Sequence, residues 1–223
     1  DTGLDKVEVF HSFFDVLGQT LGVHNATKIE ADGLPNLYGG VICIVLFIIF
    51  ARCSKISRVE KIADLSFIGF VFLSLNWSPL DFMWHGFREP NQIPSRFAFI
   101  FIFLMLLVSY RAFTLLKYVK SIDLIVSVFF AGFVLLSGYA CEIDILYSVV
   151  FIAAYLVFIW LYELKVYNEK ILVSLISVLM IVEMCINCKS GVEYLGNTKA
   201  VYDNDHEIAV LLDEIQEKDT DFY

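Results

Sequence analysis

Long apolar runs separated by short charged segments dominate the chain from residue 36 onward. The strongest are 41–51, 97–110, 124–140, 147–162 and 171–186. A helix crosses the hydrocarbon core of a bilayer with about 20 mostly apolar residues, and several runs reach that length with their uncharged flanks. A helix in a soluble core would carry a polar face at every turn. The pattern therefore predicts an all-α fold, a polytopic transmembrane helical bundle.

About six spans follow from these runs, at 36–52, 61–77, 96–115, 122–140, 144–162 and 170–188. The second is the weakest, because its apolar core is short and carries Asp64. The predicted organisation is an extracytoplasmic or interfacial segment at 1–35, a transmembrane domain at 36–188 with an outer loop at 77–96, and the start of an extracytoplasmic soluble domain at 189–223. Since the chain starts at Asp1 and stops just after a charged segment, we expect an interior fragment of a longer protein.

Both flanking segments carry helical periodicity. Residues 7–21 predict an amphipathic helix whose apolar face comprises Val7, Phe10, Phe13, Phe14, Leu17 and Leu21. Beside a membrane, such a helix suits the interface, and packing against a missing neighbouring part of the protein is an equal alternative. In the tail, Ile208, Leu211, Leu212 and Ile215 alternate with acids, which predicts an amphipathic helix opening a soluble domain.

Composition agrees with a membrane protein. The chain of 223 residues is 58% hydrophobic, against about 45–50% apolar for ordinary soluble domains. The net charge of -9 comes largely from the two flanking segments, and it indicates no nucleic-acid partner. The five cysteines form no disulfide framework, and Cys185 and Cys188 make a single C-x-x-C that we interpret as two buried small residues. We expect no metal and no cofactor.

Basic residues mark one side of the predicted membrane domain. Nine Lys and Arg lie in the loops on that side, namely Arg52, Lys55, Arg58, Lys61, Arg111, Lys117, Lys120, Lys165 and Lys170. The loops on the other side carry only Arg88 and Arg96. The positive side is expected to face the cytoplasm, which places both ends of the chain and the 77–96 loop outside. Cys141 should then react with an impermeant thiol reagent from outside, and Cys53 should not.

The outer loop is dense in polar chemistry. It combines the cationic or protonatable Arg88, Arg96 and His85 with the acids Asp81 and Glu89, and Pro90 and Pro94 make a continuous helix unfavourable. One interpretation is an interfacial anchor, with its Trp and Phe side chains in the aromatic belt and its arginines on lipid headgroups. The other is a polar pocket in which arginine forks grip a lipid-linked phosphate.

Residues 76–113 resemble a long motif of a known family. Their WHGF, PN, P and RF elements, at 84–87, 90–91, 94 and 96–97, resemble the WHGF-x-x-PN-x-x-P-x-RF-(S/A)-F segment of the bacterial membrane protein YfhO family. GLPNLYGG at 33–40 is similar to that family's LPNIYCG-like segment, with Gly39 where Cys is often found. The tail running to DTDFY looks like the family's lead into a large extracytoplasmic domain, so the resemblance covers essentially the whole chain.

This resemblance implies a multi-pass membrane glycosyltransferase of the GT-C type in the bacterial cell membrane. Such a protein takes a sugar from a polyprenyl-phosphate carrier at the outer face, and the implied acceptors are cell-envelope polymers such as teichoic acids. In GT-C enzymes the catalytic carboxylate usually lies in the first extracytoplasmic loop. An interior fragment would not contain that loop, so no catalytic residue is assigned.

The substrate-binding candidates all lie in the outer loop. Arg88 and Arg96 are expected to contact the carrier phosphate, and His85 the sugar or the phosphate. Trp84 is a possible stacking platform, and Asn91 is either a polar contact or a residue that shapes the turn. Asp81 or Glu89 as a general base is a weaker hypothesis, since the resemblance places catalysis elsewhere.

Two other functions compete with glycosyl transfer. A transporter or flippase would need polar groups along several spans, and these spans carry few beyond Glu183 and scattered serines. A non-catalytic scaffold for a missing soluble domain would use the outer loop only as an anchor. Glu183 itself is either a functional intramembrane acid or a side chain that reaches the outer surface. Asp123 is expected to cap the start of its helix.

Overall fold

The computed structural model describes residues 7–23, 33–88, 95–194, 208–210 and 215. Helices dominate these ranges, and an isolated antiparallel bridge joins Val9 to Trp77. In chain order the helices are α1 (Phe13–Gly18), α2 (Ile42–Arg52), α3 (Arg58–Ser74), α4 (Ser78–Trp84), α5 (Ala98–Phe113), the 3₁₀ turn η1 (Leu116–Tyr118), α6 (Ser121–Ala140), α7 (Leu146–Glu163) and α8 (Glu169–Tyr194).

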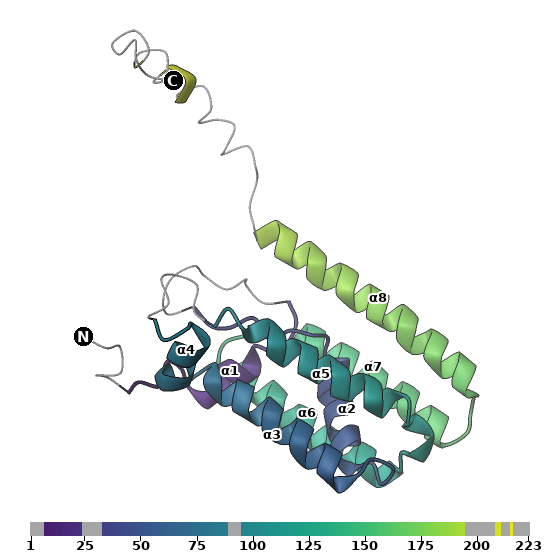
Figure 1. Ribbon diagram of the computed structural model, residues 1–223. Coiled ribbons are helices and arrows are strands. Elements are labelled where there is room, and N and C mark those ends of the chain that lie inside the picture. Colours follow the sequence, from purple (N-terminus) through teal and green to yellow (C-terminus); the bar gives the residue numbers. More distant parts are fainter. Residues whose placement is uncertain (1–6, 24–32, 89–94, 195–207, 211–214, 216–223) are drawn as a thin grey trace.

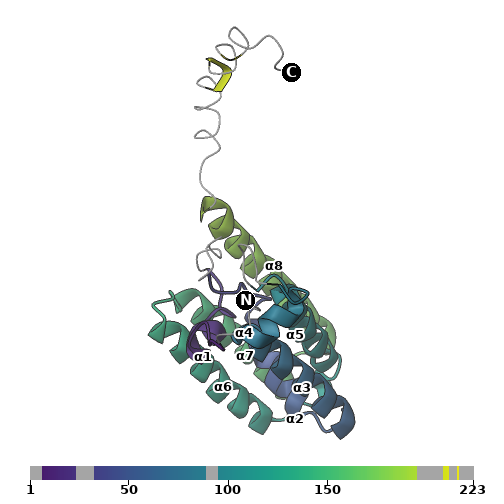
Figure 2. The ribbon, with the colours of Figure 1, turned by 60° about the vertical axis from the view of Figure 1, so that its left-hand side comes forward.

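The longer helices form one bundle, as Figure 1 and Figure 2 show from two sides. α3, α5, α6, α7 and α8 run along a similar direction and α2 crosses between them more steeply, while α1 and α4 lie together at the end where α3 finishes and α5 begins. α8 packs chiefly on α7 and continues past the bundle. The predicted all-α bundle is confirmed.

Each of the six predicted spans overlaps one of these helices, but the helices differ in length. Three are long and apolar enough to cross a membrane, namely Ser121–Ala140, Leu146–Glu163 and Glu169–Val192. α2 and α5 are apolar but shorter. α2 has 11 residues, which is about 16 Å at 1.5 Å per residue. The described helices therefore confirm membrane spans, while the number six stays a prediction.

α2 is the centre of the bundle. It packs against α5, α6 and α7, and seven of its 11 residues are buried: Ile42, Cys43, Ile44, Val45, Leu46, Ile49 and Phe50. A helix that is apolar all round suits a position enclosed by other helices. The segment before it, residues 33–41, is largely buried without being helical. Such backbone is tolerated at membrane depth where protein covers it.

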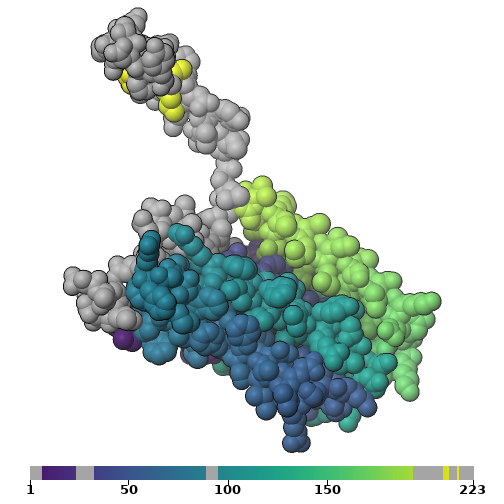
Figure 3. All heavy atoms as spheres, in the orientation of Figure 1, coloured from purple at the N-terminus to yellow at the C-terminus, as the bar shows by residue number. Residues whose placement is uncertain are grey.

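The outer surface of the bundle is apolar. On α5 the exposed fractions of Phe99 and Phe103 are 67% and 61%, and on α6 Phe129 is 75% exposed. Figure 3 shows α3 and α5 forming one broad face of the molecule with α8 along its edge. Because water-exposed helices carry polar outer faces, these faces contact lipid, and the protein lies in a membrane.

The N-terminal segment differs from the predicted amphipathic helix. The helix comprises only Phe13–Gly18, and the backbone N–H of Phe10 donates to Asn76, so the residues before α1 are extended along the start of α4. Val16, outside the predicted apolar face, is fully buried, while Phe13 is 50% exposed. α1 packs on α6 of the same chain, so its partner lies within the described bundle rather than in a missing part of the protein.

Close glycine contacts explain how α1 approaches α6. A methyl group added to Gly18 would lie 3.3 Å from the Cα of Gly138, and one added to Gly138 would lie 2.3 Å from Leu21 Cδ1. Any larger residue at position 138 would have to displace Leu21. The sequence pattern did not reveal this contact, because two glycines 120 positions apart leave no periodic signal.

Ion pairs tie the helices together at the Lys- and Arg-rich end. Arg52 Nε lies 2.7 Å from Asp123 Oδ1, which joins α2 to α6. Arg111 Nε lies 2.9 Å from Glu60 Oε1, which joins α5 to α3. Asp123 Oδ2 also accepts a hydrogen bond from the backbone N–H of Lys120 at 3.1 Å. The predicted capping role of Asp123 is confirmed, and its ion pair adds a second role.

Two further predictions concern the C-terminal part. Cys185 and Cys188 are exposed on α8, so the interpretation as buried small residues is wrong: α8 buries only one narrow stripe, and the C-x-x-C lies outside it. Residues 208–210 and 215 are helical. The rest of the predicted tail helix and the soluble domain lie outside the described residues.

Candidate functional site

The outer loop is a short helix followed by a sharp turn. α4 begins after Trp77 and carries Pro79 in its first turn, where proline costs no hydrogen bond. It ends at His85, and Gly86 and Phe87 then take φ values of +67° and +60°. A left-handed glycine ends a helix without a steric penalty. The helix therefore ends before Gly86 and Phe87, while Pro90 and Pro94, where the sequence predicts the break, lie outside the described residues.

Phe97, at the start of α5, organises the aromatic side chains of this turn. Its ring stacks on Trp84 with centroids 5.0 Å apart and planes at 14°. It also meets the edge of His85 at 6.2 Å. Trp84 further contacts Phe70 of α3. The WHGF and RF elements are therefore two halves of one packed unit, which fixes the position of the indole and the imidazole.

Asp81 and His85 form a buried polar pair one helical turn apart. Asp81 is 1% exposed, and its Oδ2 lies 3.4 Å from His85 Nδ1. The same Nδ1 lies 2.9 Å from the Asp81 carbonyl oxygen, which can only accept. His85 Nδ1 therefore carries hydrogen, and Nε2 is an acceptor in the neutral ring and a donor in the protonated ring.

Burial also changes the acidity of Asp81. Loss of hydration raises the pKa of this carboxyl above its usual range, although the charge of His85 and the backbone N–H of Ser95 oppose the rise. A carboxyl in this state is poorly suited to remain a bare anion. It is suited to orient the imidazole beside it.

Three buried polar atoms of this unit have no hydrogen-bond partner among the described residues. They are Asp81 Oδ1, Trp84 Nε1 and His85 Nε2. Buried polar groups nearly always have a hydrogen-bond partner, so a cluster of buried groups without one indicates a site for water or a ligand. We define Asp81, Trp84 and His85 as the outer polar cluster.

The comparison with protein families agrees with this motif. The model of the family described as bacterial membrane protein YfhO matches residues 7–223. The chain belongs to the YfhO family. No curated protein and no solved structure matches it. Membership in the YfhO family places the chain in a membrane and indicates a glycosyltransferase-like role there.

The five candidate residues of this YfhO-family protein have different positions. Trp84 and His85 belong to the outer polar cluster, with the His85 side chain only 11% exposed. Arg88 and Arg96 lie on either side of the turn, and both are exposed. Asn91 lies outside the described residues, as do Glu89, Pro90 and Pro94. The structure thus brings two candidates together with Asp81, which the sequence treated only as a possible base.

A second buried acid lies deeper in the bundle. Glu183 of α8 is 1% exposed, so it does not reach the outer surface. Its Oε1 accepts from the Tyr38 hydroxyl and from the Val41 backbone N–H, both at 2.7 Å. Its Oε2 accepts from the Tyr155 hydroxyl at 2.6 Å. We call these four residues the Glu183 cluster.

The Glu183 cluster has a clear structural role. Val41 is the N-cap of α2 and has no side-chain cap of its own, and a carboxylate is stabilised by the positive end of the helix dipole. The cluster joins α8 and α7 to the LPNLYGG segment. The sequence pointed to Glu183 as unusual but not to Tyr38 or Tyr155, because their spacing from it carries no local signal.

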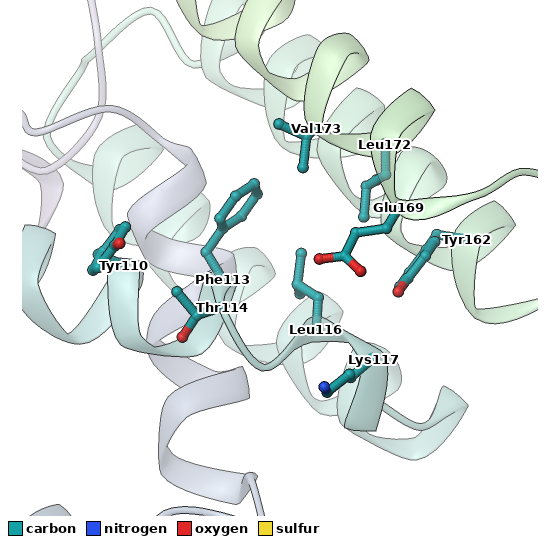
Figure 4. Close-up of a pocket in the computed structure, with 9 residues that line it drawn as sticks. All are labelled: Tyr110, Phe113, Thr114, Leu116, Lys117, Tyr162, Glu169, Leu172 and Val173. Carbon is teal, nitrogen blue, oxygen red and sulfur yellow. The ribbon is translucent and has the colours of Figure 1, made fainter.

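A separate cavity of about 260 Å³ lies at the Lys- and Arg-rich end. Figure 4 shows the Glu169 carboxylate pointing into the space between α5 and α8, with Lys117 at the edge of that space beside Leu116. None of the predicted site residues lines it. It is therefore distinct from the outer polar cluster.

Proposed function

We propose that this chain is part of a membrane glycosyltransferase that transfers a sugar from a polyprenyl-phosphate carrier to a cell-envelope polymer, such as a teichoic acid, at the outer face. The supporting observation is the outer polar cluster: its buried polar atoms have no hydrogen-bond partner among the described residues, they lie on an aromatic frame, and two exposed arginines lie near them in the sequence. Membership in the YfhO family supports the same class of reaction.

The cluster fits a phosphate held between fixed donors. The Trp84 indole N–H is an obligate donor, and the protonated His85 ring offers a second donor at Nε2. Arg88 and Arg96 are exposed near them along the chain and supply forked, charge-assisted hydrogen bonds. Asp81 acts here as a positioning residue, because it lies against His85 Nδ1 and holds the ring with Nε2 away from the helix.

The role proposed for Trp84 differs from a sugar-stacking platform. One face of its indole is covered by Phe97 at 5.0 Å. A ring that already stacks on protein offers less surface to a sugar. We therefore assign its N–H, rather than its π face, to the carrier.

The bundle interior favours transfer over transport. Three of its buried serines donate to carbonyls of their own helices: Ser74 to Phe70, Ser127 to Asp123 and Ser137 to Phe133. A hydroxyl bonded in this way has already used its hydrogen within the helix. Ser148 accepts from the Gly22 N–H, and Ser109 Oγ has no hydrogen-bond partner among the described residues. A transporter needs polar groups distributed along several spans, and the described helices carry few ionisable groups in their interior beyond Glu183.

The test uses the full-length protein with Arg88→Ala, Arg96→Ala and His85→Ala, and Arg58→Ala as a matched control at the opposite end. A hydrogen bond to a charged group contributes about 1.5–3 kcal/mol, so each site variant should lower kcat/KM for the polyprenyl-phosphate sugar by about 10- to 100-fold. Arg58→Ala should leave it unchanged. Normal polymer glycosylation in all three site variants, at normal membrane levels, would refute the proposal.

A further inference from the structure

An apolar groove opens between α3 and α6, beside the outer polar cluster. It has a volume of about 220 Å³, and residues of α1, α2 and α5 also line it. Six phenylalanines line it: Phe13, Phe47, Phe72, Phe101, Phe130 and Phe133. Thr20 is the one polar residue in this described lining, and its hydroxyl is already bonded to the Leu17 carbonyl. The groove therefore offers no polar contact to a ligand.

The groove is long enough for a hydrocarbon chain. Its α3 wall runs from Leu65 to Phe72, which is about 10 Å along a helix. An apolar cavity of about 150 Å³ already holds a benzene molecule. Phe13 and Phe133 at the mouth are 50% and 44% exposed, so the groove is open to its surroundings. In a membrane protein those surroundings are lipid, which makes a lipid chain the natural occupant.

The position of the groove connects it to the outer polar cluster. Phe101 contributes to the groove and contacts Phe72 at 5.7 Å. Phe101 follows Phe97 by one helical turn on the same face of α5. The ring of Phe97 contacts the rings of Trp84 and His85. A molecule with a phosphate at the cluster and a hydrocarbon chain below it would match this order of polar and apolar surfaces.

We propose that the groove holds the first part of the isoprenoid chain of a polyprenyl phosphate whose headgroup lies at the outer polar cluster. The assignment rests on the proposed function for its choice of ligand. An isoprenoid chain has a double bond in every unit, so ordering it freezes fewer rotors than ordering a saturated chain. This difference favours the carrier over the acyl chains of ordinary phospholipids.

Gly69 provides a test because it lines the groove and a Cβ atom added there would meet nothing within 4 Å. Gly69→Leu and Gly69→Phe should fill the groove in a graded way without straining α3. Gly132 of α6 also has open space around it and does not line the groove. Gly132→Leu and Gly132→Phe are therefore matched controls for added apolar bulk on a helix.

The measurement is binding of three probes to the full-length protein in phospholipid nanodiscs, by native mass spectrometry. The probes are a long polyprenyl phosphate, geranyl phosphate and a saturated alkyl phosphate as long as the first. Wild type should bind the long polyprenyl phosphate at least tenfold more tightly than either other probe. Gly69→Phe should remove that advantage, Gly69→Leu should remove part of it, and both Gly132 variants should keep it.

Several results would overturn the assignment. One is an unchanged chain-length advantage in Gly69→Phe, and another is equal binding of the saturated and isoprenoid probes, which would identify an unselective lipid groove. If the Gly69 variants bind like wild type while Arg88→Ala and His85→Ala still abolish transfer, the groove assignment fails and the proposed function stands. If the Gly69 variants lose binding while those headgroup variants transfer normally, the groove assignment stands and the headgroup roles fail.

Discussion

At the scale of single residues, Asp81 is the most unusual side chain of the outer loop. It is almost completely enclosed, yet the described residues supply no hydrogen bond to its Oδ1. A buried carboxyl with incomplete hydrogen bonding destabilises the folded state when it is ionised. A buried carboxyl that lowers the stability of the folded state in this way is typical of a functional site.

This arrangement predicts a pH-dependent gain from Asp81→Asn. The folded-state pKa of Asp81 is raised by burial, so the stability that its protonated form provides is lost as pH rises through that pKa. The amide cannot ionise. We expect Asp81→Asn to unfold at a higher temperature than wild type at pH 8, with the gain shrinking toward pH 4, as measured by thermal unfolding in detergent.

The same variant should transfer sugar more slowly, because an amide holds the His85 ring less well than the carboxyl group does. Asp144→Asn is the control: Asp144 is exposed and accepts a bond from the Leu146 N–H, which an Asn side chain can also accept. It should change neither property. Equal destabilisation of Asp81→Asn at both pH values would show that the carboxyl is not penalised by burial.

Sequence predicted the chemistry of this site better than its geometry. Trp84 and His85 were expected as contacts because of their residue types and their place in the WHGF element. Their common partner Phe97 was not expected, since it follows a turn in which Gly86 and Phe87 both have positive φ. That turn depends on tertiary packing, which no periodic pattern in the chain records.

At the scale of elements, the helices follow the apolar runs closely, but their starts do not. The first span was expected from 36, yet α2 begins at Ile42. Gly40 has φ +94°, and the Val41 N–H bonds to Glu183, 142 positions away. The boundary is thus set by a contact with α8. A propensity argument cannot find such a boundary, because its cause is not local.

The Glu183 cluster predicts a specific loss of stability. Glu183→Ala removes three hydrogen bonds between elements and leaves Tyr38, Tyr155 and the Val41 N–H without their acceptor. Interhelical hydrogen bonds in membranes contribute about 0.6–1.7 kcal/mol each, so the variant should lose about 2–5 kcal/mol. Glu183→Gln keeps an acceptor oxygen and adds an N–H₂ that can donate to the Tyr155 hydroxyl, so it should lose about 1 kcal/mol or less.

Equilibrium unfolding in mixed micelles would measure these differences. Met184→Ala is the control, because Met184 is the next residue of α8 and is 49% exposed; it should have little effect. A loss in Glu183→Gln as large as in Glu183→Ala would show that the charge, rather than the hydrogen bonds, stabilises the contact. No loss in either variant would show that α8 is held by other contacts.

At the scale of the whole molecule, the two ends of the bundle differ in charge. Nine Lys and Arg lie in the loops of one end, while the other end carries the outer polar cluster. Sequence predicts from this asymmetry that the basic end is cytoplasmic. The distribution of apolar faces does not test orientation, because an inverted bundle would bury the same surfaces in lipid.

Native Cys141 is a poor reporter of orientation. Its thiol donates to Asp15 Oδ1 at 2.9 Å, and burial together with this carboxylate raises the pKa of Cys141 to about 12. The thiolate is the reactive form, so alkylation at neutral pH should be slow from either side. Labelling of Cys141 from outside is therefore best tested in an Asp15→Asn variant. Removing the Asp15 carboxylate should speed the reaction of the thiol with the reagent.

Engineered cysteines on exposed positions test the orientation directly. In a background with Cys141, Cys185 and Cys188 changed to Ser, Lys55→Cys and Glu142→Cys place thiols at opposite ends of the bundle, and both positions are exposed. With an impermeant maleimide on intact cells, Glu142→Cys should be labelled, and Lys55→Cys should be labelled only after the membrane is opened. The reverse pattern would place the outer polar cluster in the cytoplasm, where an outer-face carrier could not reach it. Labelling of both positions in intact cells would contradict a membrane domain that separates the two ends.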